Sequence, residues 1–215
     1  MNGNLPQDLF FAFPNNPYTY QSPNEFMGFF GGSRNASGEM PMTVANACVQ
    51  LAFIRHADRV KIGCATSGLA MCCSADKDHV WKSASYYPMT SLIKYAKGKS
   101  IMPKVECDTF SVEPYYSDDQ NQYNGFEDVP FIQAASALNE EDGEFTVFVA
   151  NTDWTDEHEF TLDVFAFAGC TFVEQLEMAS DDPDARNTFE NQDALTLVPN
   201  AAAKCENGIV TASLK

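Results

Sequence analysis

The hydrophobic period of this sequence changes near residue 99, and that change limits the possible folds more than any other feature. Before residue 99, apolar residues recur at helical spacing in two segments. From Lys99 onward the spacing is close to two, which is typical of strands in a half-buried sheet. The sequence therefore predicts two domains, a strand–helix domain at residues 1–98 and a β-sandwich domain at residues 99–215.

The first domain reads as strand, helix, strand, helix. Strands are expected at 18–22 and in "DRVKIGCAT" (58–66), and the helix between them at 42–55 carries apolar residues around much of its surface, so we expect it to be buried. An irregular stretch follows at 67–81. Two strands joined through a helix pair in parallel by a right-handed crossover, which is the unit of a β/α barrel.

The second helix is defined by its ends. Pro88 fits the first turn, where a missing N–H is tolerated, and Gly98 suits the C-cap. The helical spacing predicts that this helix turns four residues toward the core: Met89, Leu92, Ile93 and Ala96.

The second domain consists of about seven short strand candidates separated by Asp, Asn, Gly and Pro. This pattern predicts a mainly β fold, an antiparallel, jelly-roll-like sandwich preceded by two strand–helix units. Both faces of "EFTVFVAN" are apolar, so we expect that strand to be central. The candidates are "KVECDTFSV", "VPFIQAASAL", "EFTVFVAN", "EHEFTLDVFAF", "TFVEQLEM", "ALTLV" and "GIVTASL".

The formal net charge of −17 is unevenly distributed. Up to Gly98 there are eight Lys and Arg against six Asp and Glu, and from Lys99 onward there are five against twenty-four. An acidic surface repels phosphate backbones and anionic lipid, which disfavours nucleic acid and membranes as partners and favours a neutral substrate.

The first residues contain neither a basic leader nor a long apolar run, so we expect a cytoplasmic protein. The number of cysteines is odd, seven, which fits buried thiols better than disulfides.

Glu25 in "SPNEFMGFF" is the first candidate for catalysis, a lone carboxylate among aromatic residues. The pattern alone favours a loop glutamate whose aromatic neighbours merely pack, since lone acidic residues are common in loops. A zinc site could be formed by Cys64, Cys72, Cys73 and His79, but their spacing matches no paired C-x₂-C motif, and we expect no metal.

Several segments, in order, resemble the C-terminal portion of glycoside hydrolase family 51 α-L-arabinofuranosidases. "RHADRVKIGC" is similar to the eighth barrel strand of the family, "YYPMTSLIKYAKG" to its last barrel helix, and "VECDTF" to the start of its sandwich. "NTFENQDALTLVPN" and "NGIVTASLK" resemble the closing strands of that sandwich. The resemblance covers nearly the whole chain. It implies that residues 1–98 are a partial β/α barrel, the last two strand–helix units of an eightfold barrel, packed on the C-terminal sandwich.

The resemblance implies site residues. "YTYQSPNEF" is similar to the end of the seventh barrel strand, which makes Glu25 the nucleophile, with Asn24 where the family usually has Asp and Phe26 where it usually has Trp. Substrate contacts are expected from Asn24, Phe26, Ser67 and Trp81. Tyr86 and Tyr87 are expected to pack, and the family requires no cofactor.

The acid/base glutamate of the family follows an asparagine on the fourth barrel strand, which would lie upstream of Met1. The other Asn-Glu pair in this chain, Asn139-Glu140, is in "LNEEDGE", which reads as a solvated hairpin tip. We therefore expect the C-terminal part of a retaining α-L-arabinofuranosidase acting on neutral arabinose-containing oligosaccharides, inactive alone because this chain offers no acid/base carboxylate. Its uncovered barrel surfaces should cause self-association or binding of the upstream barrel segment. The alternative is a non-catalytic sandwich module for structure, oligomerisation or carbohydrate association.

Overall fold

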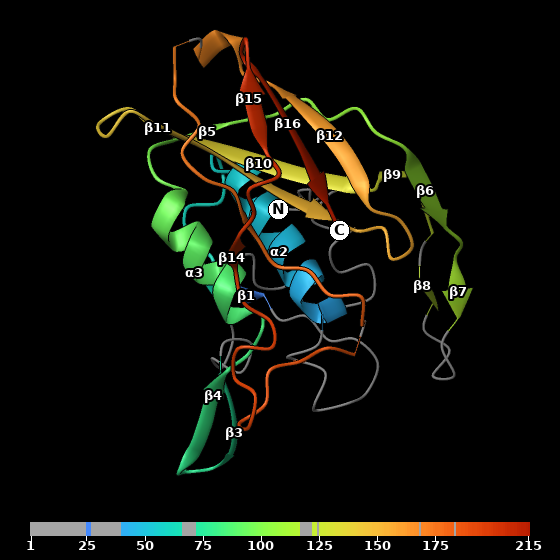
Figure 1. Ribbon diagram of the computed structural model, residues 1–215. Coiled ribbons are helices and arrows are strands. Elements are labelled where there is room, and N and C mark those ends of the chain that lie inside the picture. The colour runs from blue at the N-terminus through green and yellow to red at the C-terminus, as the bar shows by residue number, and fades with distance from the viewer. Residues whose placement is uncertain are drawn as a thin grey trace.

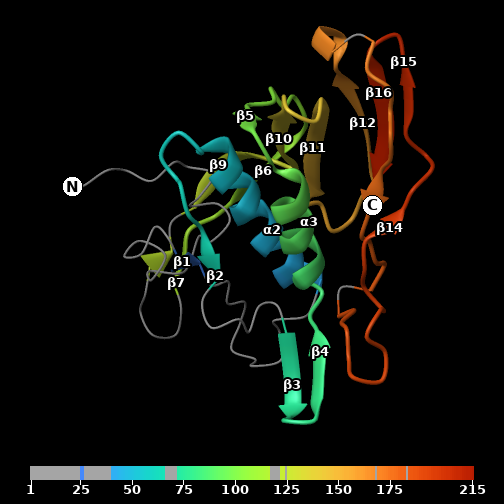
Figure 2. The same cartoon turned by 90° about the vertical axis from the view of Figure 1, so that its left-hand side faces the viewer.

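The computed structural model describes residues 25–26, 40–65, 72–116, 122–123, 125–167, 169–182 and 184–215. In this part of the chain two helices lie against one β-sheet, and a second sheet lies beyond the first (Figures 1 and 2). The predicted mainly β architecture with an antiparallel sandwich is confirmed. No helix in the described ranges combines the length and the apolarity needed to cross a bilayer.

The two predicted helices are present. Helix α2 (Met40–Arg55) is covered on several sides, as its apolar residues around the whole circumference require. Helix α3 (Tyr86–Tyr95) has Pro88 in its first turn, and the N–H of Ala96 donates to the carbonyl of Leu92 at its end. Leu92 is buried as predicted, but the prediction for Ile93 is wrong, because its side chain is 69% exposed. Helix α3 contacts its neighbours along a stripe too narrow to include both residues.

Helix α2 packs on the first sheet. The strand order in that sheet is β11 (Glu144–Asn151), β10 (Ile132–Asn139), β5 (Lys99–Ile101), and both pairings are antiparallel. The central strand is therefore β10, and the expectation that "EFTVFVAN" is central is wrong. Strand β11 has two apolar faces because one lies on the helices, through Phe148 and Ala150, and the other faces the second sheet, through Phe145.

The second sheet has the order β12 (His158–Asp163), β16 (Ile209–Leu214), β15 (Lys204–Glu206). Its strand β12 alternates between half-buried and exposed residues, the pattern expected for a sheet with one solvated face. Strands β15 and β16 are joined by Asn207-Gly208, both at positive φ (52° and 79°), which is the turn that this dipeptide favours in hairpins.

Aromatic rings bridge the two sheets. Phe145 of β11 stacks on Phe167, with ring centroids 4.2 Å apart, and Phe131 stacks on His158 of β12 at 5.7 Å. His158, which is expected from its acidic neighbours to be exposed, is instead half-buried and bonds to Asp153. The sandwich is thus closed by rings contributed from segments on both sides.

Shorter pairings complete the described fold. Residues 72–82, which belong largely to the stretch expected to be irregular, form a hairpin of β3 (Cys72–Asp76) and β4 (His79–Lys82). The strand expected at 18–22 lies outside the described residues, and the division into domains at residue 99 stays a prediction. The remaining pairs are β1 (Glu25–Phe26) with β2 (Cys64–Ala65), β6 (Thr109–Val112) with β9 (Phe126–Pro130), β7 (Tyr115–Tyr116) with β8 (Gln122–Tyr123), and β13 (Leu176–Glu177) with β14 (Val198–Pro199).

Candidate functional site

Glu25 lies in strand β1, and β1 pairs in parallel with β2. Glu25 is opposite Cys64 and Phe26 is opposite Ala65, and helix α2 lies between the two strands in the sequence. The predicted parallel pairing on either side of the helix is therefore confirmed, with the first strand at Glu25–Phe26. The side chains of Glu25 and Phe26, and the whole of Asn24 and Ser67, lie outside what the structure describes, so their roles stay predictions.

Helix α2 is fixed to its surroundings by polar contacts at both ends. Near its start, the hydroxyl of Thr43 is 3.2 Å from that of Ser85, and the side-chain amide of Asn46 donates to the same hydroxyl at 3.3 Å. At its end, Arg55 donates to the carbonyl of Ala134 at 2.9 Å and to Oε1 of Gln133 at 3.2 Å. These contacts join the strand–helix unit to helix α3 and to the central strand of the first sheet.

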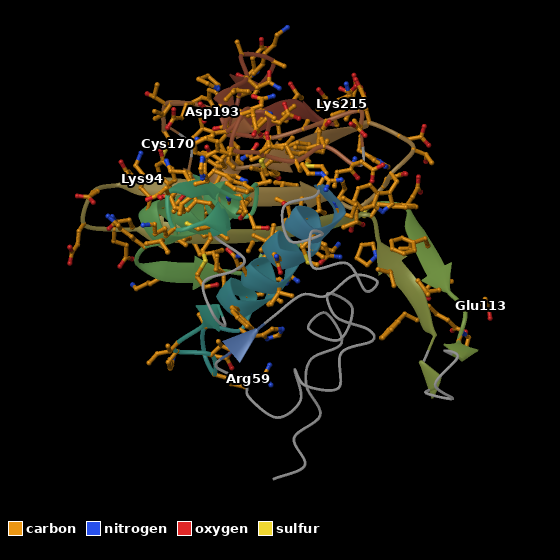
Figure 3. All side chains as sticks on the ribbon, turned by 90° about the horizontal axis from the view of Figure 1, so that it is seen from below. Arg59, Lys94, Glu113, Cys170, Asp193 and Lys215 are labelled. Atoms are coloured by element: carbon orange, nitrogen blue, oxygen red, sulfur yellow. The ribbon has the colours of Figure 1, made fainter. Side chains whose placement is uncertain are left out.

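The turn just after α2 is held by contacts between its own side chains. Arg59 forms an ion pair with Asp58 at 3.4 Å and lies 2.9 Å from Nδ1 of His56. Figure 3 shows Arg59 on the opposite side of the helices from Asp193. The charges of Arg59 and Asp58 therefore pair with each other on an exposed surface.

Trp81 lies on strand β4, half-buried. Its indole Nε1 donates to the carbonyl oxygen of Asn187 at 2.8 Å, and its ring meets Phe189 edge-on at 6.4 Å. Phe189 also contacts the ring of His79, with centroids 4.6 Å apart at an interplanar angle of 77°. The β3–β4 hairpin therefore meets a loop that is more than one hundred residues later in the sequence.

The loop that carries Phe189 is held from within. Asn187 is almost fully buried, and its side chain makes two hydrogen bonds to the main chain of Leu195: Nδ2 donates at 2.9 Å and Oδ1 accepts at 2.7 Å. The N–H of Thr188 donates to the carbonyl of Asn191 at 3.0 Å. No local pattern in the sequence indicates that Asn187, Phe189 and His79 share a surface, because they lie in segments far apart in the chain.

Tyr86 and Tyr87 are engaged within the chain. The hydroxyl of Tyr87 donates to Asp193 at 3.2 Å, and burial raises the pKa of this phenol. The ammonium of Lys82 lies 4.8 Å from the centre of the Tyr86 ring. Both contacts hold the start of α3 against the 187–195 loop and the hairpin, which is the packing role expected for the two tyrosines.

The candidate zinc ligands do not form a described cluster. The side chains of Cys64 and Cys73 are outside the described residues, Cys72 is exposed, and His79 packs on Phe189. Among the described side chains, no group of three or more His, Cys, Asp and Glu is placed to hold a metal ion. Cys48 is buried in α2, and burial raises the pKa of its thiol to about 12, so it remains protonated and unreactive at neutral pH.

Asn139-Glu140 lies where β10 turns into β11, which confirms the predicted hairpin tip. Asn139 donates from Nδ2 to Asp142 at 2.7 Å, and Glu140 forms an exposed ion pair with Lys99 at 2.6 Å. Asn139 is thus used by the turn itself, and Glu140 ties the turn to the start of strand β5.

Comparison with known proteins identifies relatives of this chain. The sequence profile of the family described as "Alpha-L-arabinofuranosidase C-terminal domain" matches residues 31–215. The intracellular exo-alpha-(1->5)-L-arabinofuranosidase 1 of Bacillus subtilis is 24% identical over 162 residues, covering 74% of this chain and 30% of the relative. The exo-alpha-(1->6)-L-arabinofuranosidase of Bifidobacterium longum is 25% identical over 172 residues, covering 77% and 31%. The chain thus spans about 30% of the length of these curated relatives.

Solved structures show the same fold. The family 51 α-L-arabinofuranosidase of Thermotoga petrophila superposes with a TM-score of 0.73 at 17% identity, over 89% of this chain and 40% of that protein. The α-L-arabinofuranosidase of Thermotoga maritima, solved as an arabinose complex, gives a TM-score of 0.71 at 18% identity over the same shares. The resemblance drawn from the sequence is confirmed: this chain belongs to the α-L-arabinofuranosidase C-terminal domain family and corresponds to the C-terminal portion of glycoside hydrolase family 51 arabinofuranosidases.

Proposed function

We propose that this chain supplies the C-terminal part of a retaining α-L-arabinofuranosidase, an enzyme that removes terminal non-reducing arabinofuranosyl groups from neutral oligosaccharides. One observation carries the proposal: strand β1, with Glu25, pairs in parallel with β2 and is joined to it through α2. In β/α barrels, catalytic groups lie at the carboxyl ends of such strands. The names of the curated relatives, exo-acting arabinofuranosidases, support the substrate class.

In the proposed reaction, the carboxylate of Glu25 attacks the anomeric carbon of the arabinofuranosyl group. The glycosidic C–O bond breaks as a second carboxyl group gives its proton to the leaving oxygen. That carboxylate then takes a proton from water, which attacks the anomeric carbon and releases Glu25, so that the configuration is retained. The two carboxyl groups must be about 5 Å apart, and we propose that barrel strands outside this chain supply the second one.

We further propose that the same barrel strands cover the exposed side of the strand–helix unit. Ile62, in the segment that leads into β2, is 64% exposed, which is unusual for an apolar residue beside a barrel strand. The covering strands would belong either to the same longer polypeptide or to a partner. Relatives named intracellular support a cytoplasmic location, which the acidic composition also fits.

The test is hydrolysis of an activated arabinofuranoside by the full chain, alone and mixed with the N-terminal portion of a relative. We expect turnover in the mixture, and Glu25→Gln should lower it by roughly 10³-fold or more, because the nucleophile is lost. Glu140→Gln is the matched control, since this exposed glutamate is expected to leave the rate unchanged. Turnover that survives Glu25→Gln would exclude Glu25 as the nucleophile.

A non-catalytic module for structure or oligomerisation is the second candidate function. The observation that favours it is the matched family profile, which describes a C-terminal domain. Under this proposal, the mixture shows no turnover with any variant, while the two polypeptides still associate in sedimentation experiments. The two proposals therefore predict different results in the same mixture.

A further inference from the structure

The β3–β4 hairpin and the loop at 187–191 place three rings together on the surface. Phe189 lies between the other two, with His79 at 4.6 Å and Trp81 at 6.4 Å, and both contacts are edge-on. Phe189 is 38% exposed and His79 is exposed as well, so the cluster is not part of the core. We define this set of His79, Trp81 and Phe189 as the aromatic surface.

The aromatic surface is fixed by hydrogen bonds on both sides. The indole N–H of Trp81 donates to the carbonyl of Asn187, which fixes the orientation of the indole ring against Phe189. The buried amide of Asn187 in turn holds the two ends of the loop together through Leu195. A surface whose rings are already positioned loses little conformational entropy when a ligand binds.

Two structural units contribute to this surface. The hairpin follows β2 and precedes α3, so it rises from the carboxyl end of the strand that pairs with Glu25's strand. Phe189 comes from the segment between β13 and β14, which descends to the hairpin in both Figure 1 and Figure 2. The carboxyl ends of barrel strands form the catalytic face, and the hairpin therefore lies on the same face as Glu25.

The chemistry of the aromatic surface fits a neutral sugar. Aromatic rings pack against the C–H faces of sugar rings and keep polar groups around them for the hydroxyls, as in other mostly apolar sites with a few polar groups. Asp78 lies beside His79 in the sequence, and Glu190 follows Phe189 directly. Asp78 forms an exposed ion pair with Lys77 at 3.9 Å, whereas Glu190 is an exposed carboxylate next to Phe189 in the sequence. The negative charge of Glu190 disfavours anionic sugars.

We propose that the aromatic surface binds the part of a neutral arabinofuranosyl oligosaccharide that lies on the leaving-group side of the cleaved bond, with Phe189 and His79 as the stacking residues. The proposal rests on the proposed function, since it places the surface beside the site of Glu25. It adds a contribution of the sandwich domain, through Phe189, to substrate binding.

The experiment uses the full chain in a Trp154→Phe background, which leaves Trp81 as the only tryptophan of the two in the sequence. Titration with a neutral arabinofuranosyl trisaccharide should give a saturable change in Trp81 fluorescence, with calorimetry as a second readout. We expect Phe189→Ala to weaken binding about tenfold, which is about 1.4 kcal/mol, and His79→Ala to weaken it severalfold. Phe189→Leu keeps an apolar side chain in the loop and should also weaken binding, which separates stacking from folding.

Phe165→Ala is the matched control, because Phe165 is 70% exposed and lies in a short 3-10 helix at the end of the sandwich opposite the hairpin (Figure 1). Its removal should leave saccharide affinity unchanged. A trigalacturonate should bind more weakly than the neutral trisaccharide, because the negative charge of Glu190 repels the carboxylate groups of that sugar.

Binding and turnover are read separately. Glu25→Gln tests the proposed function through turnover in the mixture, whereas Phe189→Ala tests the aromatic surface through trisaccharide binding by the chain alone, so that loss of one does not imply loss of the other. The inference is overturned if wild type does not bind the trisaccharide, if Phe189→Ala binds as tightly as wild type, or if Phe189→Ala changes only the oligomeric state.

Discussion

Gly98 illustrates how a single backbone angle governs the connection from helix α3 to strand β5. Its φ is +86°, in the left-handed region that favours glycine, and a Cβ atom at this position would overlap the carbonyl oxygen of Leu138. Helix α3 ends at Tyr95 and its C-cap is Ala96, so the prediction of Gly98 as the C-cap is wrong by two residues. Gly98 therefore lets the chain pass close to the end of β10 before β5 pairs with it.

We predict that Gly98→Ala lowers the free energy of unfolding by about 3 kcal/mol or more, because backbone strain and overlap with Leu138 add. Gly143→Ala separates these two effects, since Gly143 also has positive φ (+70°) but open space around a Cβ. That variant should lose only about 1 kcal/mol. Urea unfolding of both variants measures the difference, and equal losses would contradict the predicted overlap.

The ionised carboxylate of Asp153 organises the loop before β12 by accepting several hydrogen bonds. Its carboxylate accepts hydrogen bonds from the hydroxyl and the N–H of Thr155, at 2.7 and 2.9 Å, and from His158 at 2.9 Å. These bonds, with those from Thr155 first, hold the pKa of Asp153 well below its ordinary value of 3.8. A lowered pKa means that the folded protein is stabilised by this carboxylate above the ordinary pKa and loses that contribution as the pH falls below it.

We therefore predict that Asp153→Asn is less stable than wild type at pH 7 and that the gap narrows below about pH 4, where the wild-type carboxyl is protonated on unfolding. Urea midpoints at pH 7, 5 and 3 measure the gap. Glu106→Gln serves as the control: its carboxylate pairs with Lys104 in full contact with solvent, so its removal should leave the urea midpoint nearly unchanged at all three pH values. A gap of the same size at pH 7 and pH 3 would show that Asp153 acts only through its shape.

At the scale of elements, helix α3 shows how packing selects from a predicted apolar face. Leu92 lies in a core cluster with Leu51 of α2 and Ala135 of β10, while Ile93, its neighbour in the sequence, is exposed. Spacing alone allows both residues to face the core, because a helical apolar stripe has no sharp edge. The position of α2 and the sheet on one side of α3 decides between them.

We predict that Leu92→Ala lowers the free energy of unfolding by about 2–5 kcal/mol, through lost apolar contacts and a cavity beside Leu51. Ile93→Ala, one residue further, should change it by less than about 1 kcal/mol, because the removed atoms are already in water. Denaturant unfolding compares the two directly. Losses of similar size would mean that Ile93 is covered in solution, by a partner or by another part of the enzyme.

At the scale of the whole molecule, the described chain forms three layers, with the helices and the second sheet on opposite sides of the first sheet (Figure 2). The layers cover some residues that the sequence led us to expect on the surface. His158, for example, is half-buried beneath the ring of Phe131, although its sequence neighbours are acidic. Ile62 and the segment leading into β2 remain exposed, and this is where covering barrel strands are proposed to bind.

We predict that the purified chain self-associates with increasing concentration through this exposed strand–helix surface. Sedimentation velocity measures the association, and Ile62→Ser should weaken it, whereas Ile93→Ser, at an equally exposed residue of α3, should not. Addition of the N-terminal portion of a relative should compete with it. A chain that stays monomeric at high concentration and binds no hydrophobic dye would contradict the prediction.

The sequence by itself determined features that depend on residues close together in the chain. Pro88 marked the start of the second helix, the period of two indicated the sandwich strands, and "LNEEDGE" indicated a hairpin tip, because helix starts, alternation and turns are local properties. Only the tertiary structure decided which strand is central, since β10 and β11 are both apolar and differ only in what pairs with their outer edges. It alone brought Trp81 to Asn187 and Phe189, because contacts between segments so distant arise from the packing of whole layers, which no local pattern encodes.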